Sequence, residues 1–233
     1  MCGRFVSTQP PDKLAEYFGA SFEGDALPAN HNVAPTNQVY GVVGTAGGGA
    51  RVEVFQWGLV PTWAKDTKIG SRLINARAET ILEKPAFRTE FKRRRLLVPM
   101  DGFYEWQARP GTTKQPMFIH DAHDEPLAAA GLWSVWRDKE AGPDAPWLHT
   151  LTIITTAANA TMTPVHDRMP VFLPRREWAR WLDPANTDGP ALQQLLVPAP
   201  DDLLVMHPVS TKVNNVRNKG ADLIEQIDPE TPA

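Results

Sequence analysis

The sequence predicts an α+β fold, a single domain with a mostly antiparallel, barrel-like β-sheet core and few peripheral helices. Short runs of apolar or β-branched residues, typical of strands, dominate the middle of the chain. Turns rich in glycine, proline and aspartate separate these runs at a spacing that favours antiparallel neighbours. The 233 residues contain no internal repeat and no linker long enough to separate two domains. We therefore expect one domain over residues 1–227 and a short frayed tail over residues 228–233.

The individual elements follow from local patterns. Residues 12–18 predict a helix, because their large apolar side chains share one face and Gly19 follows as a stop. The glycine-rich residues 44–49 predict a flexible hairpin tip. Further helices are predicted over residues 175–182 and 190–196, and strands over residues 51–55, 96–98, 103–106, 117–120, 127–135 and 148–156.

The composition is that of an ordinary soluble globular protein, with 42% hydrophobic and 22% charged residues. No stretch approaches about 18 consecutive apolar residues, so the sequence predicts no membrane span. No basic leader followed by an apolar run is visible, so no secretory signal is expected either. These observations predict a cytoplasmic protein, and we expect it to be a monomer.

The chain has one cysteine, Cys2. A single cysteine excludes an internal disulfide and a zinc site built from several thiolates. His120 and His123 lie close together in the sequence, but no further ligand cluster accompanies them. We therefore expect neither a metal ion nor another cofactor, and the thiol needs a different explanation.

The position of Cys2 suggests a chemical role. Loss of Met1 would leave a free α-amine beside the thiol, and a 1,2-aminothiol condenses with an aldehyde to a Schiff base and then closes a thiazolidine ring. Because the pKa of an α-amine is about 7.7 to 8.0, this group is neutral at pH 7 far more often than a lysine. A cysteine present at this position by chance is the alternative explanation.

The net charge of -3 hides a gradient along the chain. Residues 51–95 contain eleven lysines and arginines against five acidic residues, whereas residues 177–233 contain four against nine. The basic segment indicates a face that meets an anionic partner, and phosphate neutralisation dominates the affinity for nucleic acids. Residues 92–95 are the densest part of this segment. The alternative interpretation of this basic run is a strand edge that only faces solvent.

Two motifs in the middle of the chain combine polar groups with apolar surroundings. Asn75, Arg77 and Glu79 alternate along a predicted strand or edge, where an amide can fix an amine and a guanidinium can clamp a phosphate. Glu105 lies in an apolar, aromatic strand, where its pKa is expected to rise and suit it to proton transfer. In both motifs, side chains that simply face solvent are the alternative.

Two further motifs complete the candidate residues. His166 begins an apparent loop over residues 166–170. A histidine followed by Asp and Arg is suited to acid–base catalysis combined with anion binding. Trp57 and Trp63 lie at a turn close to the basic segment, as stacking on single-stranded DNA requires. A structural histidine and core tryptophans are the alternatives.

Taken together and in this order, the motifs resemble those of the SOS response-associated peptidase (SRAP) family, the abasic site processing proteins, in its compact bacterial form. The resemblance runs from Cys2 to about residue 224, which is nearly the whole chain. It rests on MCGRF at residues 1–5, NVAP at 32–35, WGLVP at 57–61, NARAET at 75–80, DGFYEW at 101–106, HDRMP at 166–170 and HPVS at 207–210.

The resemblance implies a protein that senses abasic sites in single-stranded DNA and shields them as a covalent thiazolidine crosslink during the DNA damage response. The matching residues here would be Cys2 as nucleophile, Asn75 as positioning group, Glu105 as proton shuttle and His166 as acid–base group. The residues expected to bind DNA are Arg4, Asn32, Pro35, Trp63, Arg77 and Arg168.

The resemblance further implies abasic-site lyase activity, autoproteolytic removal of Met1, and action at replication forks in the nucleoid. Two other function classes fit the residues. One is a cysteine peptidase or amidohydrolase that pairs Cys2 with His166, and the other is a non-covalent reader of modified or single-stranded DNA. Only the abasic-site interpretation needs the α-amine as well as the thiol.

Overall fold

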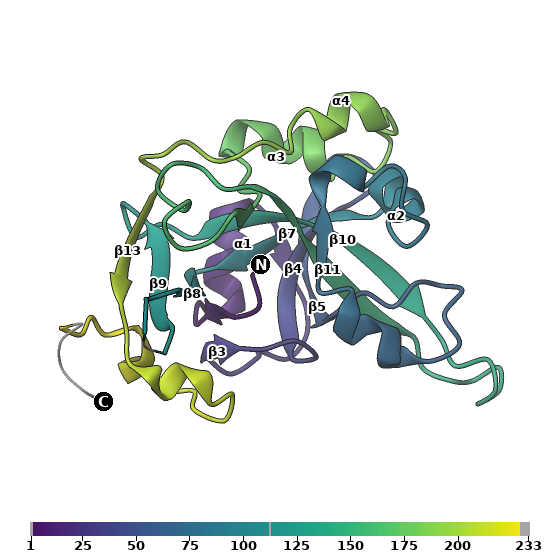
Figure 1. Cartoon of the computed structure of the whole chain (residues 1–233). Coiled ribbons are helices and arrows are strands. Elements are labelled where there is room, and N and C mark those ends of the chain that lie inside the picture. The colour runs from purple at the N-terminus through teal and green to yellow at the C-terminus, as the bar shows by residue number, and fades with distance from the viewer. Residues whose placement is uncertain (1, 112, 229–233) are drawn as a thin grey trace.

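The computed structural model describes residues 2–111 and 113–228, and this part of the chain forms two β-sheets (Figure 1). The first sheet has five strands in the order β13-β9-β8-β1-β3, and each neighbouring pair is antiparallel. It therefore unites the first and last strands of the chain. Its members are β1 (Phe5–Ser7), β3 (Asn30–Val33), β8 (Gly102–Gln107), β9 (Gln115–Asp121) and β13 (Leu204–Pro208).

The second sheet follows the order β12-β11-β10-β7-β4-β5-β2, with β6 paired to β11. A further parallel pairing between β5 and β11 joins Trp57 to Leu151 and closes five of the strands into a ring. The α+β prediction with a barrel-like core is therefore confirmed. The strands are β2 (Ser21–Phe22), β4 (Gln38–Gly44), β5 (Ala50–Trp57), β6 (Asn75–Arg77), β7 (Arg95–Met100), β10 (Leu127–Trp136), β11 (Leu148–Ala157) and β12 (Arg168–Pro170).

Four α-helices lie at the periphery of the part that the structure describes: α1 (Pro11–Phe18), α2 (Arg88–Arg93), α3 (Arg175–Leu182) and α4 (Gly189–Gln193). α1 ends as predicted, because Gly19 adopts a left-handed conformation with φ 62° and donates its N–H to helix carbonyls. α4 is shorter than the predicted 190–196. Leu195 and Leu196, which follow the helix, form 3₁₀-type bonds to Leu192 and Gln193, and Pro198 cannot continue a helix. Short 3₁₀ helices are η1 (Thr67–Arg72), η2 (Ala78–Thr80), η3 (Thr211–Asn214) and η4 (Ala221–Ile224).

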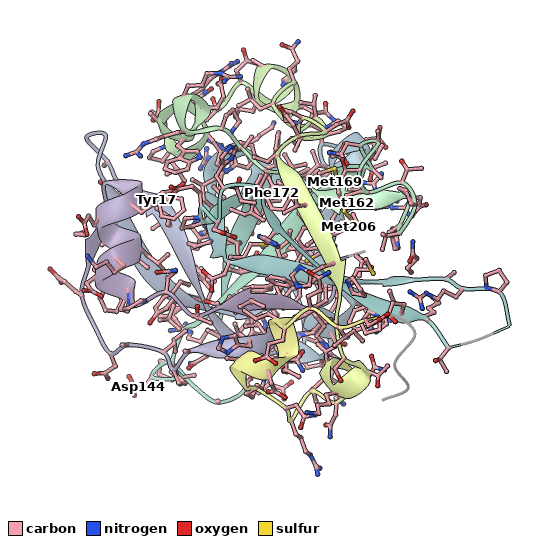
Figure 2. All side chains as sticks on the ribbon, turned by 90° about the vertical axis from the view of Figure 1, so that its left-hand side faces the viewer. Tyr17, Asp144, Met162, Met169, Phe172 and Met206 are labelled. Atoms are coloured by element: carbon pink, nitrogen blue, oxygen red, sulfur yellow. The ribbon has the colours of Figure 1, made fainter. Side chains whose placement is uncertain are left out.

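Three hydrophobic clusters fill the spaces around the sheets. The first lies between them and includes Cys2, Trp57 and Leu151. Figure 2 shows Met162 and Met169 of this cluster near Met206, which packs against it. The second cluster lies between the barrel and the α-helices, and the third lies between the five-stranded sheet and the C-terminal segment. Cys2 is therefore enclosed where the two sheets meet.

Two local predictions are wrong. Residues 166–170 are not wholly a loop, because Arg168–Pro170 form β12 and pair with the end of β11. Residues 92–95 are not a solvated strand edge, because they span the end of α2 and the start of β7, and Arg95 is buried. Within the described ranges, no helix has the length and apolar character needed to cross a bilayer.

Candidate active site

Cys2 lies immediately before β1, and its side chain is fully buried between the sheets. Burial raises the pKa of the Cys2 thiol well above its usual range, and the negative charge of Glu105 raises it further. A backbone hydrogen bond from Arg4 lowers this pKa by less. The thiol is therefore held in its protonated form at neutral pH.

Asn75 brings a second predicted residue directly to Cys2. It begins β6, which pairs in parallel with β11 opposite Ile153, so its backbone is fixed by the barrel. Its Nδ2 donates a hydrogen bond of 2.7 Å to the Cys2 carbonyl. Its buried Oδ1 has no hydrogen-bond partner among the residues that the structure describes. Asn75 thus orients the backbone of Cys2 and keeps an acceptor ready for an amine or hydroxyl donor.

Glu105 lies in β8, and its side chain is only 5% exposed. The residue pairs with Met117 across the sheet, and its carboxylate is close enough to Cys2 to act on the thiol pKa. A surface-facing Glu105, the alternative interpretation of the sequence, is excluded by this burial. The site therefore holds a thiol and a carboxylate together in a water-poor core.

His166 lies in the turn that leads into β12, and its neighbours Met162 and Val165 belong to the same buried cluster as Cys2. Its Nδ1 is 2.9 Å from the backbone nitrogen of Arg168 and 2.8 Å from a carboxylate oxygen of Asp167. The contact with the backbone N–H requires Nδ1 to accept a hydrogen bond, whereas the contact with the carboxylate requires it to donate one. Because the backbone N–H always carries a hydrogen, we assign Nδ1 as the acceptor, which leaves the proton of the neutral ring on Nε2.

Arg168 is held by the motif at residues 75–80. Its two terminal nitrogens contact both carboxylate oxygens of Glu79 at 2.6 and 3.0 Å, and one also donates to the Thr155 carbonyl. This bidentate pairing lowers the pKa of Glu79. Arg77, two residues before Glu79, is exposed at the end of β6. The pair therefore links the segment that carries His166 to the segment that carries Arg77, and Arg77 is the more exposed of the two arginines.

Asn32 and Arg4 form an internal network. Asn32 is fully buried, its Nδ2 lies 3.1 Å from the carbonyls of Val213, Asn215 and Asn218, and its Oδ1 accepts from Arg4. Burial lowers the pKa of Arg4. Both residues were expected to bind DNA, and the structure places them where they tie the N-terminal strand to the C-terminal loop.

The two tryptophans of the WGLVP region occupy different environments. Trp57 is fully buried and donates its ring N–H to the Ile74 carbonyl, so it belongs to the core. Trp63 is 57% exposed, and Pro35 is partly buried. Of the two indoles, only Trp63 presents a face on which a base could stack.

Lys219 is a residue of this region that the sequence did not indicate. Its ammonium group donates to the Asn32 carbonyl at 2.6 Å and contacts Asn37 Oδ1 at 3.3 Å, at the edge of a cavity of about 430 Å³. Burial lowers its pKa, and the charge of Arg4 lowers it further. Lys219 belongs to the acidic C-terminal segment, so no local pattern connects it to Asn32.

Fold and site together define a cysteine-centred α+β protein whose single thiol lies buried between two sheets. A crystal structure of a protein from Bacteroides thetaiotaomicron has this fold, with a TM-score of 0.86, 24% identity, and coverage of 97% of this chain and 100% of that one. A phage-related protein from Bordetella bronchiseptica has a TM-score of 0.68 and 28% identity, with coverage of 89% and 94%.

The model of the SOS response associated peptidase (SRAP) family matches residues 1–216, and this chain belongs to that family. The abasic site processing protein YoqW of Bacillus subtilis is 42% identical over 228 residues, which are 97% of this chain and 99% of the relative. The abasic site processing protein HMCES of Gallus gallus is 35% identical over 201 residues, which are 76% of this chain and 58% of the relative.

Proposed function

We propose that this protein captures abasic sites in single-stranded DNA as a covalent crosslink to Cys2 and thereby shields the lesion during the DNA damage response. The observation that carries the proposal is the hydrogen bond from Asn75 to the Cys2 carbonyl beside the buried Glu105. The names of the relatives, abasic site processing proteins, support the choice of substrate.

The proposed reaction begins with hydrolysis of the peptide bond between Met1 and Cys2, in which water adds to the carbonyl carbon and the α-amine of Cys2 leaves. The deoxyribose at the lesion opens by breaking its ring C–O bond and presents an aldehyde. The amine adds to the aldehyde carbon, and loss of water leaves a Schiff base. The sulfur then adds to the imine carbon while the thiol proton passes to the nitrogen, which closes a five-membered thiazolidine. No oxidant or reductant is needed, since every step is an addition or an elimination.

The high thiol pKa bears on the order of these steps. A protonated thiol is a poor nucleophile, whereas an α-amine with a pKa of about 8 is partly neutral at pH 7. The amine therefore attacks first, and the sulfur follows once a base accepts its proton. In the proposal Glu105 is that base, Asn75 orients the amine, and His166 exchanges a proton with the sugar hydroxyl through Nε2.

The DNA contacts divide between accessible and positioning residues. Arg77 would bind a phosphate beside the lesion and Trp63 would stack on a neighbouring base, since both are exposed. Arg4, Asn32, Pro35 and Arg168 would shape the channel for the strand. Lyase activity, autocatalytic loss of Met1, and action of a monomer at replication forks in the nucleoid belong to the same proposal.

The rival cysteine peptidase would need a thiolate that is stable near neutral pH. Burial raises the pKa of the Cys2 thiol instead of lowering it, and the nearby charge of Glu105 acts in the same direction. A thiolate paired with His166 is therefore disfavoured in this site. The buried thiol fits a role in which sulfur acts second, after an imine has formed.

Mass spectrometry of the purified protein mixed with single-stranded DNA carrying one abasic site tests the proposed function. We expect a species whose mass equals the chain without Met1 plus the oligonucleotide, less one water. DNA without the lesion, and DNA with a reduced sugar that lacks the aldehyde, should give no such species. Failure to detect the adduct with the aldehyde-bearing strand would disprove covalent capture.

Glu105→Gln is expected to slow crosslink formation by about 100-fold, because proton transfer by a positioned carboxylate contributes at least that much. Affinity for DNA that carries the reduced abasic analogue should stay unchanged, since Glu105 is buried and meets no phosphate. Glu53→Gln, a substitution on β5, is the control and should leave both quantities unchanged. A wild-type rate in the Glu105→Gln variant would refute the proton-transfer role.

A further inference from the structure

The outer face of α2 carries a cluster of exposed cations. Arg88, Lys92 and Arg93 are exposed there together with Thr89. We call these four residues the α2 patch. The opposite face of the helix buries Phe91 against β10 and β7. The patch therefore lies on the side of α2 that faces away from the sheet.

None of the three cations of the α2 patch forms an ion pair within the described residues. The only acid of the helix, Glu90, is turned inward, where it is 5% exposed and accepts from Ser134. Three exposed cations elsewhere are paired with acids, namely Lys13 with Glu16, Arg51 with Glu53, and Arg176 with Glu177. The α2 patch therefore keeps its positive charge.

This arrangement is unfavourable for the isolated protein. Arg88 and Lys92 are four positions apart on the helix, and like charges at that spacing destabilise it. The helix dipole favours Lys92 and Arg93 in the last turn but disfavours a cation at Arg88, the first residue. Helix stability therefore does not account for the cluster, whereas an anionic partner that neutralises all three charges would.

The shape and chemistry of the α2 patch match phosphate groups. Its four residues, together with Leu82, line a shallow cavity of about 280 Å³. No aromatic ring lines this cavity, so it offers no platform for stacking bases. Two guanidinium groups, an ammonium group and a hydroxyl supply hydrogen-bond donors of the kind that phosphate oxygens accept.

The position of the α2 patch connects it with the proposed DNA site. Arg77 begins the segment that runs through η2 and leads into α2. In space, β6 pairs with β11, and α2 packs on β10, the neighbour of β11 (Figure 1). We propose that the α2 patch binds the sugar–phosphate backbone of the DNA that flanks the captured lesion. This inference rests on the proposed function and extends it beyond the site around Cys2.

The test uses the full chain with Arg88, Lys92 and Arg93 all replaced by glutamine. A control variant carries Lys13→Gln, Arg51→Gln and Arg176→Gln, which changes the net charge equally at residues that are already paired with acids. Affinity is measured against salt concentration for a short oligonucleotide that ends next to the lesion and for longer ones with single-stranded or duplex flanks. Undamaged DNA of the same lengths completes the set.

With the longer DNA, the α2 variant should bind at least about tenfold more weakly at low salt, and the slope of log affinity against log salt should fall by about 2. The short oligonucleotide should bind and crosslink as it does to wild type. Comparing the two flank types shows whether a single strand or a duplex occupies the patch. The thermal midpoint of the variant should equal or exceed that of wild type, because a repulsion is removed.

Two results would overturn the proposal. One is wild-type affinity of the α2 variant for every long DNA, which is also the result expected if the patch serves an acidic protein. The other is an equal loss on the short oligonucleotide. If even the wild-type chain fails to crosslink abasic DNA, the proposed function fails, and the undamaged DNA still decides whether the α2 patch binds a phosphate backbone.

Discussion

A chain that carries one extra residue in front of Cys2 is expected to form no durable adduct with an abasic site. The added peptide bond turns the α-amine into an amide, which cannot form a Schiff base, while the thiol, Glu105 and Asn75 stay in place. Because the buried thiol has a raised pKa, it cannot take over as first nucleophile. Adducts are measured by denaturing gel electrophoresis of mixtures with abasic single-stranded DNA, and only the chain that starts at Cys2 should form them.

Two substitutions at Cys2 separate the steps of this reaction. Cys2→Ser keeps the amine, so borohydride should trap its Schiff base, but without sulfur no stable ring forms. Cys2→Ala should behave in the same way under borohydride and should retain non-covalent affinity for DNA. A durable adduct formed by the extended chain, or by Cys2→Ser without borohydride, would contradict the thiazolidine mechanism.

Arg95→Ala is expected to destabilise the protein by about 3 kcal/mol or more, because several buried acceptors lose their donor at once. Arg95 is 3% exposed, and its guanidinium donates to four carbonyls, which belong to Phe91, Trp181, Asp183 and Asn186. Burial lowers its pKa to about 10, so the charge itself is costly to bury. For a chain of this length, the thermal midpoint should fall by roughly 10 °C.

Arg93→Ala is the matched control, since Arg93 is exposed two residues earlier and donates to none of these carbonyls. Its effect on stability should stay within about 0.5 kcal/mol. Arg95→Lys should recover only part of the loss, because an ammonium has three donors and lacks the planar fork that reaches four separate acceptors. Equal midpoints for Arg95→Ala and Arg93→Ala would show that the buried network contributes nothing to stability.

The regular elements were largely predictable from the sequence. Strands with clear alternation or apolar runs, such as β5 and β10, and helices with a defined stop, such as α1, lie close to their predicted positions. β4 was missed because Gly41 interrupts its apolar run. The structure explains that glycine, since a Cβ there would lie 3.0 Å from Leu96 and Phe55 in the centre of the barrel. β12 was missed because it has three residues and ends in a proline, which is too short to give an alternating pattern.

The candidate site was predictable as a set of residues but not as a geometry. The motifs indicated Asn75 and Glu105, and the structure places Asn75 on the Cys2 carbonyl and Glu105 in the same core. The roles of charged and polar groups depend on distant partners. Arg168 is paired with Glu79, 89 positions away, and Asn32 is bonded to Val213, 181 positions away. No local pattern encodes such separations.

The hydrogen bonds between Asn32 and the loop after η3 have a consequence for folding during translation. Asn32, Arg4 and Lys219 interlock across 181 to 209 positions of the chain, and the five-stranded sheet needs both β1 and β13. During translation β1 leaves the ribosome early, whereas these partners leave it about 180 to 210 residues later. If Cys2 carries the aldehyde-reactive amine of the proposed mechanism, an unfinished chain would expose that amine to any cellular aldehyde. The contacts of residues 213–219 with Arg4 and Asn32 would then make the selectivity of Cys2 depend on a segment that is synthesised long after the cysteine itself.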